Sequence, residues 1–283
     1  MANYHHTEGI CLRRIDYSNT SQVASFLTPD SGRLSVLAKG VTRAPKRGIR
    51  TGFDLLGRYD LIYTARRYGS LQNLTYRWLK EDFHGLRSAL ERVICGYYAA
   101  ELALNFATEG DPCPGLYELM LRSLRNLAAG KKLGVTVLLL ELGVLREHGA
   151  CPTFGACAEC GRALPGRGPV PFSPADGGPL CRDCEMKLRA ERRWRVTAVS
   201  AGVLRQLATL SAQTDADPDA APLSPKATVA MSAVLRFHMR DLLARELRMW
   251  KYLGRQELSR SLTRLRRGSG LRGRTGGGQK HRL

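Results

Sequence analysis

Four cysteines stand in two pairs that have the spacing of metal ligands. The pairs, Cys157-Ala-Glu-Cys160 and Cys181-Arg-Asp-Cys184, are separated by twenty residues. Two Cys-x2-Cys knuckles around a spacer of this length are typical of a structural zinc ribbon. Four thiolates satisfy the tetrahedral preference of zinc and leave no open position for water or substrate. We therefore predict one structural Zn²⁺ ion that folds the segment around it.

The other cysteines are interpreted as thiols without a metal. A redox role for the knuckles is the alternative, but a thioredoxin-like pair lies at a strand-to-helix junction, whereas these knuckles lie among glycines. Cys151 is close to them in sequence and is interpreted as a buried bystander that could replace a ligand in an altered site. Phe172 and Gly177-Gly178 fit a hairpin that returns the chain to the metal, with Phe172 packed beneath it. The isolated cysteines are predicted to be buried: Cys11, Cys95 and Cys113.

The sequence lacks the motifs of common enzyme classes. Gly130-Lys-Lys-Leu-Gly134 has its lysines in the wrong places for a phosphate-binding loop. There is no Gly-x-Ser-x-Gly elbow and no His-x-x-x-His pair, and His5-His6 is predicted to be exposed to solvent. Residues 1–80 contain only 5 acids, well separated, whereas a nuclease needs clustered carboxylates to hold Mg²⁺. We predict a binding protein and not an enzyme.

Positive charge is concentrated at the two ends of the chain, which has a formal net charge of +19. Residues 1–80 contain 13 Lys and Arg against 5 Asp and Glu, residues 81–253 contain 22 against 19, and residues 254–283 contain 9 against 1. Lys and Arg placed on phosphates release condensed counterions, so two concentrated basic regions favour nucleic acid as the ligand. A solubility function or an anionic membrane surface is the alternative.

The N-terminus and the cysteine usage favour a location in the cytoplasm. No stretch approaches the roughly eighteen consecutive apolar residues of a membrane span, and residues 1–9 lack the build of a signal peptide. Disulfides are rare in the cytoplasm, which agrees with cysteines that bind metal or are buried. We expect a cytoplasmic, nucleoid-associated protein without a membrane partner.

The first part of the chain is predicted to form a small β-barrel. Apolar residues alternate in short runs, and Thr28-Pro-Asp-Ser-Gly32 has the composition of a hairpin turn. Five such runs in about eighty residues suit a barrel, and the basic charge makes an OB-fold the natural candidate for residues 1–82. The predicted strands include residues 10–12, 23–27, 34–38, 54–65 and 71–79.

Helical periodicity begins after Asp82. Pro114 is placed to open a helix, and Gly149 to end an apolar helix that we expect near the centre of the helical domain. The predicted helical segments are residues 86–102, 116–127, 135–145, 204–210 and 226–253.

Together these elements predict an α+β fold with more than one domain. Residues 83–253 are expected to form an all-α helical domain, into which a four-cysteine zinc ribbon is inserted at about residues 151–190. This insertion has too few apolar side chains for a core of its own. Residues 254–283 contain seven Gly and few large apolar residues, and they are predicted to be a disordered, Gly/Arg-rich basic tail.

Several stretches accompany the two knuckles in a fixed order: Arg14-Ile-Asp-Tyr-Ser-Asn-Thr-Ser21, Thr28-Pro-Asp-Ser-Gly-Arg-Leu-Ser-Val-Leu-Ala-Lys-Gly40 and Phe172-Ser-Pro-Ala-Asp-Gly-Gly178. As an ordered set they resemble the RecO family of bacterial recombination mediators, from about residue 8 to residue 253. The resemblance implies an N-terminal OB-fold, a helical domain with an embedded zinc ribbon and a role in recombinational DNA repair. The tail departs from the family pattern, and the chain keeps four zinc cysteines that many members lack.

The resemblance also implies the partners. Members of the RecO family bind single- and double-stranded DNA and anneal complementary strands coated by single-stranded-DNA-binding protein. They act with RecR, and often RecF, to load RecA, and none of these steps requires ATP hydrolysis by the family member itself. The physical basis of annealing is that a protein which neutralises phosphates on both strands lowers their mutual repulsion until base pairing takes over.

The predicted DNA contacts cluster after the third strand. Five basic residues within twelve positions should lie on a loop at the barrel surface: Lys39, Arg43, Lys46, Arg47 and Arg50. Arg13 and Arg14 extend this patch. Aromatic residues of the barrel could stack on bases, although alternation along strands predicts that most are core residues: Tyr17, Tyr59, Tyr63, Tyr76 and Trp78.

The helical middle is predicted to dock the acidic C-terminal peptide of single-stranded-DNA-binding protein. The resemblance supplies this partner, and basic residues beside apolar helices supply the site. The predicted contacts are Arg122, Arg125, Lys131, Lys132, Leu138 and Leu142.

Two functions of other classes remain as alternatives. A ribosome- or RNA-associated zinc-ribbon structural protein would also be basic, cytoplasmic and tailed by Gly and Arg. A transcriptional regulator is disfavoured, because no compact helix-turn-helix with a basic recognition helix stands out.

Overall fold

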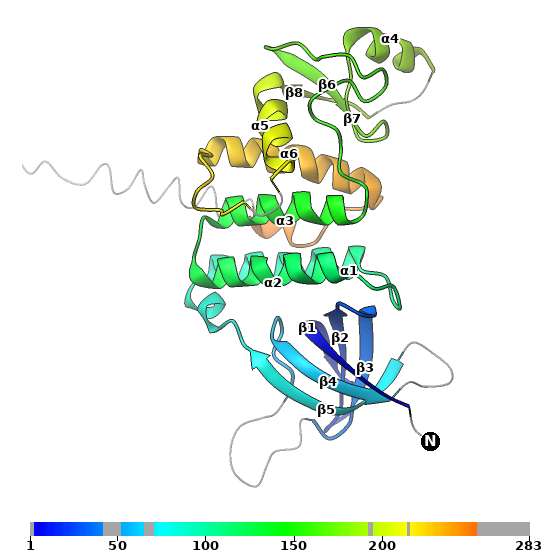
Figure 1. Ribbon diagram of the computed structural model, residues 1–283, viewed down its shortest axis with the longest axis vertical. Coiled ribbons are helices and arrows are strands. Elements are labelled where there is room, and N and C mark those ends of the chain that lie inside the picture. Colours follow the sequence, from blue (N-terminus) through cyan, green and yellow to red (C-terminus); the bar gives the residue numbers. More distant parts are fainter. Residues whose placement is uncertain (1–2, 42–51, 65–70, 192–194, 214–215, 254–283) are drawn as a thin grey trace, which may run out of the picture.

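The computed structural model of the protein describes residues 3–41, 52–64, 71–191, 195–213 and 216–253. Figure 1 shows a β-barrel at one end of the long axis, a stack of helices in the middle, and a small sheet with one helix at the other end. Among the helices of the described residues, none is both long enough and apolar enough to cross a membrane. The predicted tail, residues 254–283, lies outside the described residues.

Five strands close into a barrel in the order β1-β2-β3-β5-β4. They are β1 (Tyr4–Asp16), β2 (Gln22–Thr28), β3 (Gly32–Ala38), β4 (Arg58–Thr64) and β5 (Leu71–Glu81). β3 and β5 pair in parallel, and the other neighbours are antiparallel. This is the arrangement of a five-stranded OB-fold, so the predicted barrel is confirmed.

The barrel interior is apolar and rich in aromatic rings. Alternate residues of β2, β3 and β4 are buried, as the two-residue period of a strand requires. Phe26, Phe53 and Tyr59 meet edge to face, with ring centroids 5.1 to 5.9 Å apart. Aromatic pairs favour this geometry. Phe53 belongs to the segment before β4, which therefore fills the inside of the barrel with a side chain from a loop.

A short 3₁₀ turn, η1 (His84–Ser88), leads from β5 into the helices. The helices of the middle layer are α1 (Leu90–Phe106), α2 (Pro114–Ala129), α3 (Leu133–Glu147), α5 (Ala201–Ser211) and α6 (Pro225–Leu242). α3 buries ten of its fifteen residues and lies between α1 and α2 on one side and α6 on the other (Figure 1). The prediction of a central apolar helix is thus confirmed, and Pro114 opens α2 as expected.

The last helix is shorter than predicted. α6 ends at Leu242, and the chain turns at Ala244, which has a positive φ of 52°. The segment beyond returns to α1, where the Glu101 carboxylate accepts the backbone N–H groups of Arg248 at 2.7 Å and Met249 at 2.9 Å. Periodicity alone predicts a helix up to residue 253, but the segment after Leu242 instead contacts Glu101, which lies far away in the sequence.

The far end of the molecule is a three-stranded sheet in the order β7-β6-β8, followed in Figure 1 by the helix α4 at the tip. Its elements are β6 (Pro169–Ser173), β7 (Gly178–Pro179), α4 (Arg182–Glu191) and β8 (Thr197–Ser200). Phe172 is fully buried but does not pack beneath the cysteines as expected. Its ring meets His238 of α6, with centroids 6.4 Å apart, because the alternation along β6 turns Val170 and Phe172 towards the helical core.

The hairpin turn between β2 and β3 joins the barrel to the helices. Arg33 donates its backbone N–H to the Thr108 carbonyl at 2.9 Å, and Gly110 donates to the Ser31 carbonyl at 3.0 Å. Gly32 has a φ of 57°, and a Cβ atom there would lie 2.3 Å from the Thr108 oxygen, so only glycine fits. Three barrel residues join the hydrophobic core of the helices: Ile10, Leu12 and Leu27.

Candidate metal centre and nucleic-acid interface

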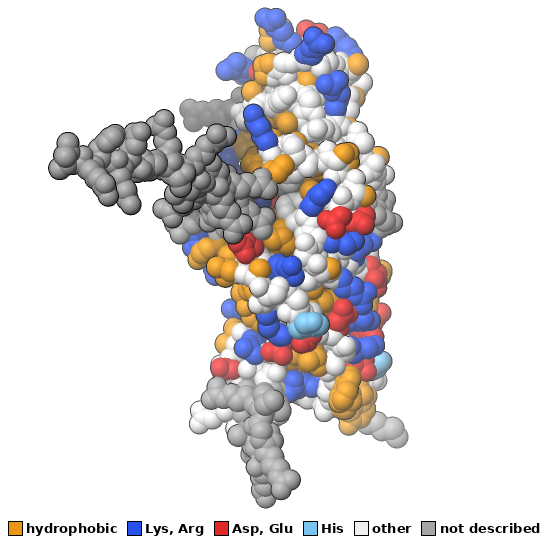
Figure 2. Space-filling model, turned by 90° about the vertical axis from the view of Figure 1, so that its left-hand side faces the viewer, with side chains coloured by type: hydrophobic (Ala, Val, Ile, Leu, Met, Phe, Trp, Pro, Cys, Tyr) orange, Lys and Arg blue, Asp and Glu red, His pale blue; other side chains and the backbone are white. Residues whose placement is uncertain are grey.

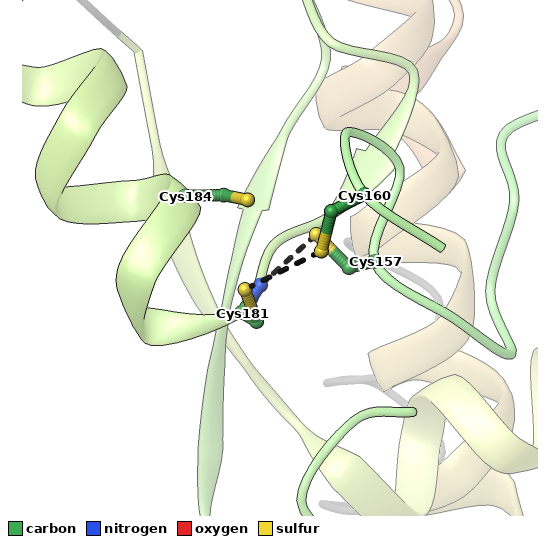
Figure 3. Close-up of side chains that lie close together, drawn as sticks. All are labelled: Cys157, Cys160, Cys181 and Cys184. Carbon is green, nitrogen blue, oxygen red and sulfur yellow. Dashed lines mark hydrogen bonds between the residues drawn. The ribbon is translucent and has the colours of Figure 1, made fainter. Parts of the chain in front are cut away.

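The four knuckle cysteines converge on one point, as Figure 3 shows. Their sulfur atoms all lie within 4.8 Å of one another. Four sulfurs held about 2.3 Å from a zinc ion at the corners of a tetrahedron lie about 3.8 Å apart. The Sγ atoms of Cys160 and Cys181 are 3.8 Å apart. The donor set therefore fits a tetrahedrally coordinated metal ion.

Local hydrogen bonds shape each knuckle. In the first knuckle Gly161 donates its backbone N–H to the Cys157 carbonyl at 2.9 Å, and its φ of 71° favours glycine. In the second knuckle Glu185 donates to the Cys181 carbonyl at 2.9 Å, which starts α4. Cys184 follows one helical turn after Cys181, so both sulfurs lie on the side of α4 that faces the first knuckle (Figure 3).

The backbone around Cys157 favours a thiolate. Although burial raises the pKa of this thiol, the backbone N–H groups of Cys160, Cys181 and Glu159 lower it to about 6. One of these donors is the Cys181 N–H, 3.3 Å from the Cys157 sulfur. The pKa of Cys184 is raised to about 12, first by its hydrogen bond with Cys181 and then by burial. A metal ion must displace protons from this cluster, because thiolates are the ligands.

The ribbon has little apolar material of its own. Its buried hydrophobic cluster consists of Cys157, Leu180, Cys184 and Leu188, so two of its four members are ligand candidates. An ion pair of 2.8 Å between Arg162 and Asp183 links the two knuckles, but both side chains are about two-thirds exposed, and exposed pairs contribute little. A metal ion bound by the four cysteines would therefore add a crosslink to a segment with little core of its own.

The described candidates for DNA contact lie near one end of the barrel. Arg13 and Arg14 are in the last part of β1, and Lys39 directly follows β3, whose last residue pairs with the start of β2. Arg13, Arg14 and Lys39 are all exposed, and the Arg14 guanidinium also donates to the Phe53 carbonyl. The other predicted contacts lie outside the described residues: Arg43, Lys46, Arg47 and Arg50.

Two models of protein families match the chain, one after the other. The model described as Recombination protein O N terminal matches residues 1–80, which include all five barrel strands except the last residue of β5. The model described as Recombination protein O C terminal matches residues 87–251. The chain belongs to the RecO family. Membership assigns it to DNA repair and recombination.

Curated relatives agree with the RecO-family assignment. A protein of Anaeromyxobacter sp. (strain K) is 34% identical over 243 residues, which is 83% of this chain and 92% of the relative. A protein of Rhodopirellula baltica is 32% identical over 253 residues, covering 84% and 92%. One of Desulforudis audaxviator is 38% identical over 186 residues, covering 63% and 69%. All three are named DNA repair protein RecO.

The leucines expected to contact a partner peptide are core residues in this RecO-family chain. Leu138 and Leu142 are 0% and 2% exposed, because α3 is surrounded by other helices. This part of the expected peptide site is therefore corrected: neither leucine offers a surface.

The four basic residues expected beside them lie on or next to α2 and at the start of α3. Arg125 pairs with Glu81 at 2.8 Å, Lys131 pairs with Asp217 at 2.9 Å, and Lys132 donates to the Asp219 carbonyl at 2.8 Å. Arg122 is exposed on α2. Figure 2 shows Lys and Arg interspersed with Asp and Glu over the middle of the molecule, as the nearly balanced charge of this part predicts.

The barrel aromatics divide into two groups. Tyr59 and Tyr63 are 2% and 8% exposed, as the alternation along β4 requires. Tyr17, Tyr76 and Trp78 are 69%, 49% and 65% exposed. The sequence predicts that side chains alternate along β5. Which of them face outwards depends on the register between β5 and β4, which are separate strands of the barrel.

Proposed function

We propose that this RecO-family chain is a non-enzymatic, DNA-binding recombination mediator in the cytoplasm, associated with the nucleoid. It anneals complementary strands and helps RecR, together with RecF, to load RecA. The observation that carries the proposal is the match of both parts of the chain to one recombination family. The OB-fold barrel, with Arg13 and Lys39 exposed near one end, supports it, because such barrels bind single strands through basic grooves.

Annealing needs groups that neutralise phosphate and no group that makes or breaks a covalent bond. Two strands repel each other through their phosphates, and basic side chains that contact both lower this repulsion. Arg13 and Lys39 supply such groups on the barrel, and the sequence places nine more Lys and Arg in residues 254–283. The excess of basic residues at both ends of the chain supports contact with two strands.

We further propose that the metal is a single Zn²⁺ ion bound by Cys157, Cys160, Cys181 and Cys184. When bound, the ion supplies a structural crosslink between the first knuckle and α4. The chain's own contribution is the backbone donors that lower the pKa of Cys157, and the hydrogen bonds of Gly161 and Glu185 to the Cys157 and Cys181 carbonyls that shape the two knuckles. Four protein ligands complete a tetrahedral ion, so no position is left for a substrate.

Strand pairing tests the proposed function directly. Complementary labelled DNA strands are coated with single-stranded-DNA-binding protein, and their pairing is followed by fluorescence with and without the purified chain. We expect faster pairing with the chain present, and no effect on strands of unrelated sequence. A pairing rate unchanged by the chain, together with its co-sedimentation with ribosomes, would favour the RNA-associated alternative.

A second part of the proposal is that the acidic C-terminal peptide of single-stranded-DNA-binding protein docks beside Arg122, Arg125, Lys131 and Lys132. Asp217 pairs with the Lys131 ammonium, and Lys132 donates to the Asp219 backbone carbonyl, so a peptide carboxylate would compete with groups of the chain itself. Exposed ion pairs are weak and can be exchanged.

Peptide affinity, measured by fluorescence anisotropy, tests this placement. Asp217→Asn combined with Asp219→Asn should tighten binding, because Lys131 loses its ionic partner Asp217 and two negative charges are removed from beside the lysines. Lys131→Glu combined with Lys132→Glu should weaken it. If both double variants bind the peptide as the wild type does, the peptide docks elsewhere.

A further inference from the structure

Two large aromatic side chains stand next to each other on the outside of the barrel. Tyr76 and Trp78 of β5 are 49% and 65% exposed. Their partners across β4 are Ile62 and Asp60, and the residue between these two, Leu61, is fully buried in the barrel. Since successive side chains of a strand point to opposite faces, Tyr76 and Trp78 share the outer face.

The helices leave this outer face open. The face continues across β4 to β1, where Tyr4 is 64% exposed and pairs with Thr64. Trp and Tyr are the residue types that dominate binding energy at protein surfaces, because each offers a large rigid area with few torsions to freeze. Their exposure side by side on one sheet indicates a contact surface.

The acids on this face have hydrogen-bond partners within the protein. Asp60 lies 2.6 Å from His6, and Glu8 accepts from Arg58 and Lys80. Residues 1–80 as a whole carry 13 Lys and Arg against 5 Asp and Glu. The net charge of the barrel therefore favours the approach of a polyanion to Tyr76 and Trp78.

We infer that Tyr76 and Trp78 form a stacking platform for two neighbouring bases of a single DNA strand. The inference rests on the proposed DNA-binding function and names for it side chains other than the basic residues around Lys39. Residues two apart on a strand are about 7 Å apart. Exposed aromatic residues on a sheet hold neighbouring bases in this way in the RNA-recognition motif, and stacking tolerates any base sequence.

Stacking is compatible with annealing because it uses the faces of the bases and not their Watson–Crick edges. The rings of Tyr76 and Trp78 cover base faces, which are already covered in a duplex, so the platform prefers single strands. The Watson–Crick edges stay open to an incoming strand. Phosphate contacts elsewhere on the barrel then provide charge neutralisation, and the platform provides bases that are spread and accessible.

Affinity for an oligo-thymidine single strand, followed by anisotropy of a label on the DNA, tests the platform. Trp78→Ala should weaken binding by about 5- to 160-fold, which corresponds to the loss of one stacked base. Trp78→Phe should retain most of the affinity, because an aromatic face remains. The dependence of affinity on salt should keep the wild-type slope, since no phosphate contact is lost.

Three controls accompany the measurement. Tyr97→Ala removes an aromatic side chain of 41% exposure from α1, outside the barrel, and should leave single-strand affinity unchanged. Affinity of Trp78→Ala for duplex DNA should equal that of the wild type. The circular dichroism spectrum and metal content of each variant show whether it is folded.

Two outcomes would overturn the platform. The first is a Trp78→Ala variant that binds single strands as tightly as the wild type does. If the same variant no longer binds RecR, the face is a protein interface. The second is equal loss for single and double strands with a smaller salt slope, which would make the face a phosphate site. Neither outcome touches the proposed function, which fails only if the wild-type chain itself neither binds single strands nor accelerates pairing.

Discussion

Tyr98 donates its hydroxyl proton to the Glu141 carboxylate, 2.7 Å away, and so connects α1 to α3. Glu141 is fully buried, and Arg236 of α6 donates to the same oxygen at 3.2 Å. Burial and the charge of Glu141 raise the pKa of Tyr98 well above its ordinary value, so the phenol remains a donor. Trp250 donates its indole N–H to the Tyr98 oxygen at 3.0 Å, which ties the C-terminal segment to the same group.

The first prediction is that Arg236→Met destabilises the helical middle by about 3 kcal/mol, because Glu141 keeps a buried charge without its cationic partner. Adding Glu141→Gln should recover most of the loss, since the remaining amide is neutral. Urea unfolding of the two variants and the wild type measures both values. Equal stability of Arg236→Met and the wild type would show that the carboxylate does not depend on this partner.

The second prediction concerns the metal ribbon. Cys157→Ser or Cys181→Ser should lower the metal content from one ion per chain and reduce the thermal stability, because metal binding supplies the folding energy of such a ribbon. DNA affinity should change much less, since the barrel is at the other end of the molecule. Elemental analysis and thermal unfolding measure the first two effects. Cys151→Ser is the matched control and should keep both the metal and the melting temperature.

The third prediction concerns the basic residues after β3. Lys39→Glu with Arg43→Glu should weaken DNA of every sequence alike, because phosphate contacts carry no base information. The salt slope for single strands should fall by about 1.4, which is the loss of two phosphate contacts. Affinity measured from low to high salt gives the slope. The competing assignment puts the main DNA site in residues 254–283, in which case deleting them abolishes binding and the double variant keeps the wild-type slope.

The fourth prediction concerns acid. Burial lowers the pKa of His238, although its hydrogen bond to the Ala150 carbonyl at 2.9 Å opposes this. The unfolded chain takes up this proton near pH 6.5, and the folded chain does so only at a lower pH. Stability from His238 is therefore present above pH 6.5 and is lost as the pH falls from there towards the folded pKa.

Denaturant unfolding at pH 7.5 and pH 5.5 measures this loss. His238→Gln should make the difference between the two pH values smaller, by up to about 1.4 kcal/mol per pH unit of the window. His84→Gln, in a side chain that is 89% exposed, is the matched control for substitution of a surface histidine. A variant at His238 with the pH dependence of the wild type would rule out this histidine as the source.

Features that depend on neighbours in the sequence could be predicted from it. The cysteine knuckles have a fixed short spacing, and the four sulfurs indeed meet. The alternation of β2 and β3 and the glycine at position 32 indicated the barrel hairpin, since both are local properties. Pro114 marked the start of α2 because proline is best tolerated in the first helical turn.

Features that depend on packing could not. Alternation alone does not tell whether Trp78 or Tyr59 faces outwards. The pairing of β4 with β5 decides that Trp78 is exposed and Tyr59 is buried. Leu138 and Leu142 look like surface candidates beside Lys131 and Lys132, but α3 packs against α1, α2 and α6, and both side chains are buried. The end of α6 is decided by contacts with Glu101, which is more than a hundred residues earlier in the chain.

The glycine turn at the barrel has a mechanical consequence. Because backbone hydrogen bonds on both sides of Gly32 lock the β2–β3 turn to the loop between α1 and α2, the barrel cannot swing on its connection without breaking them. The stack of helices is then a rigid connection between the barrel and the tip that bears the cysteines (Figure 1). Anything carried at the tip is therefore kept at a constant distance from DNA held at the barrel.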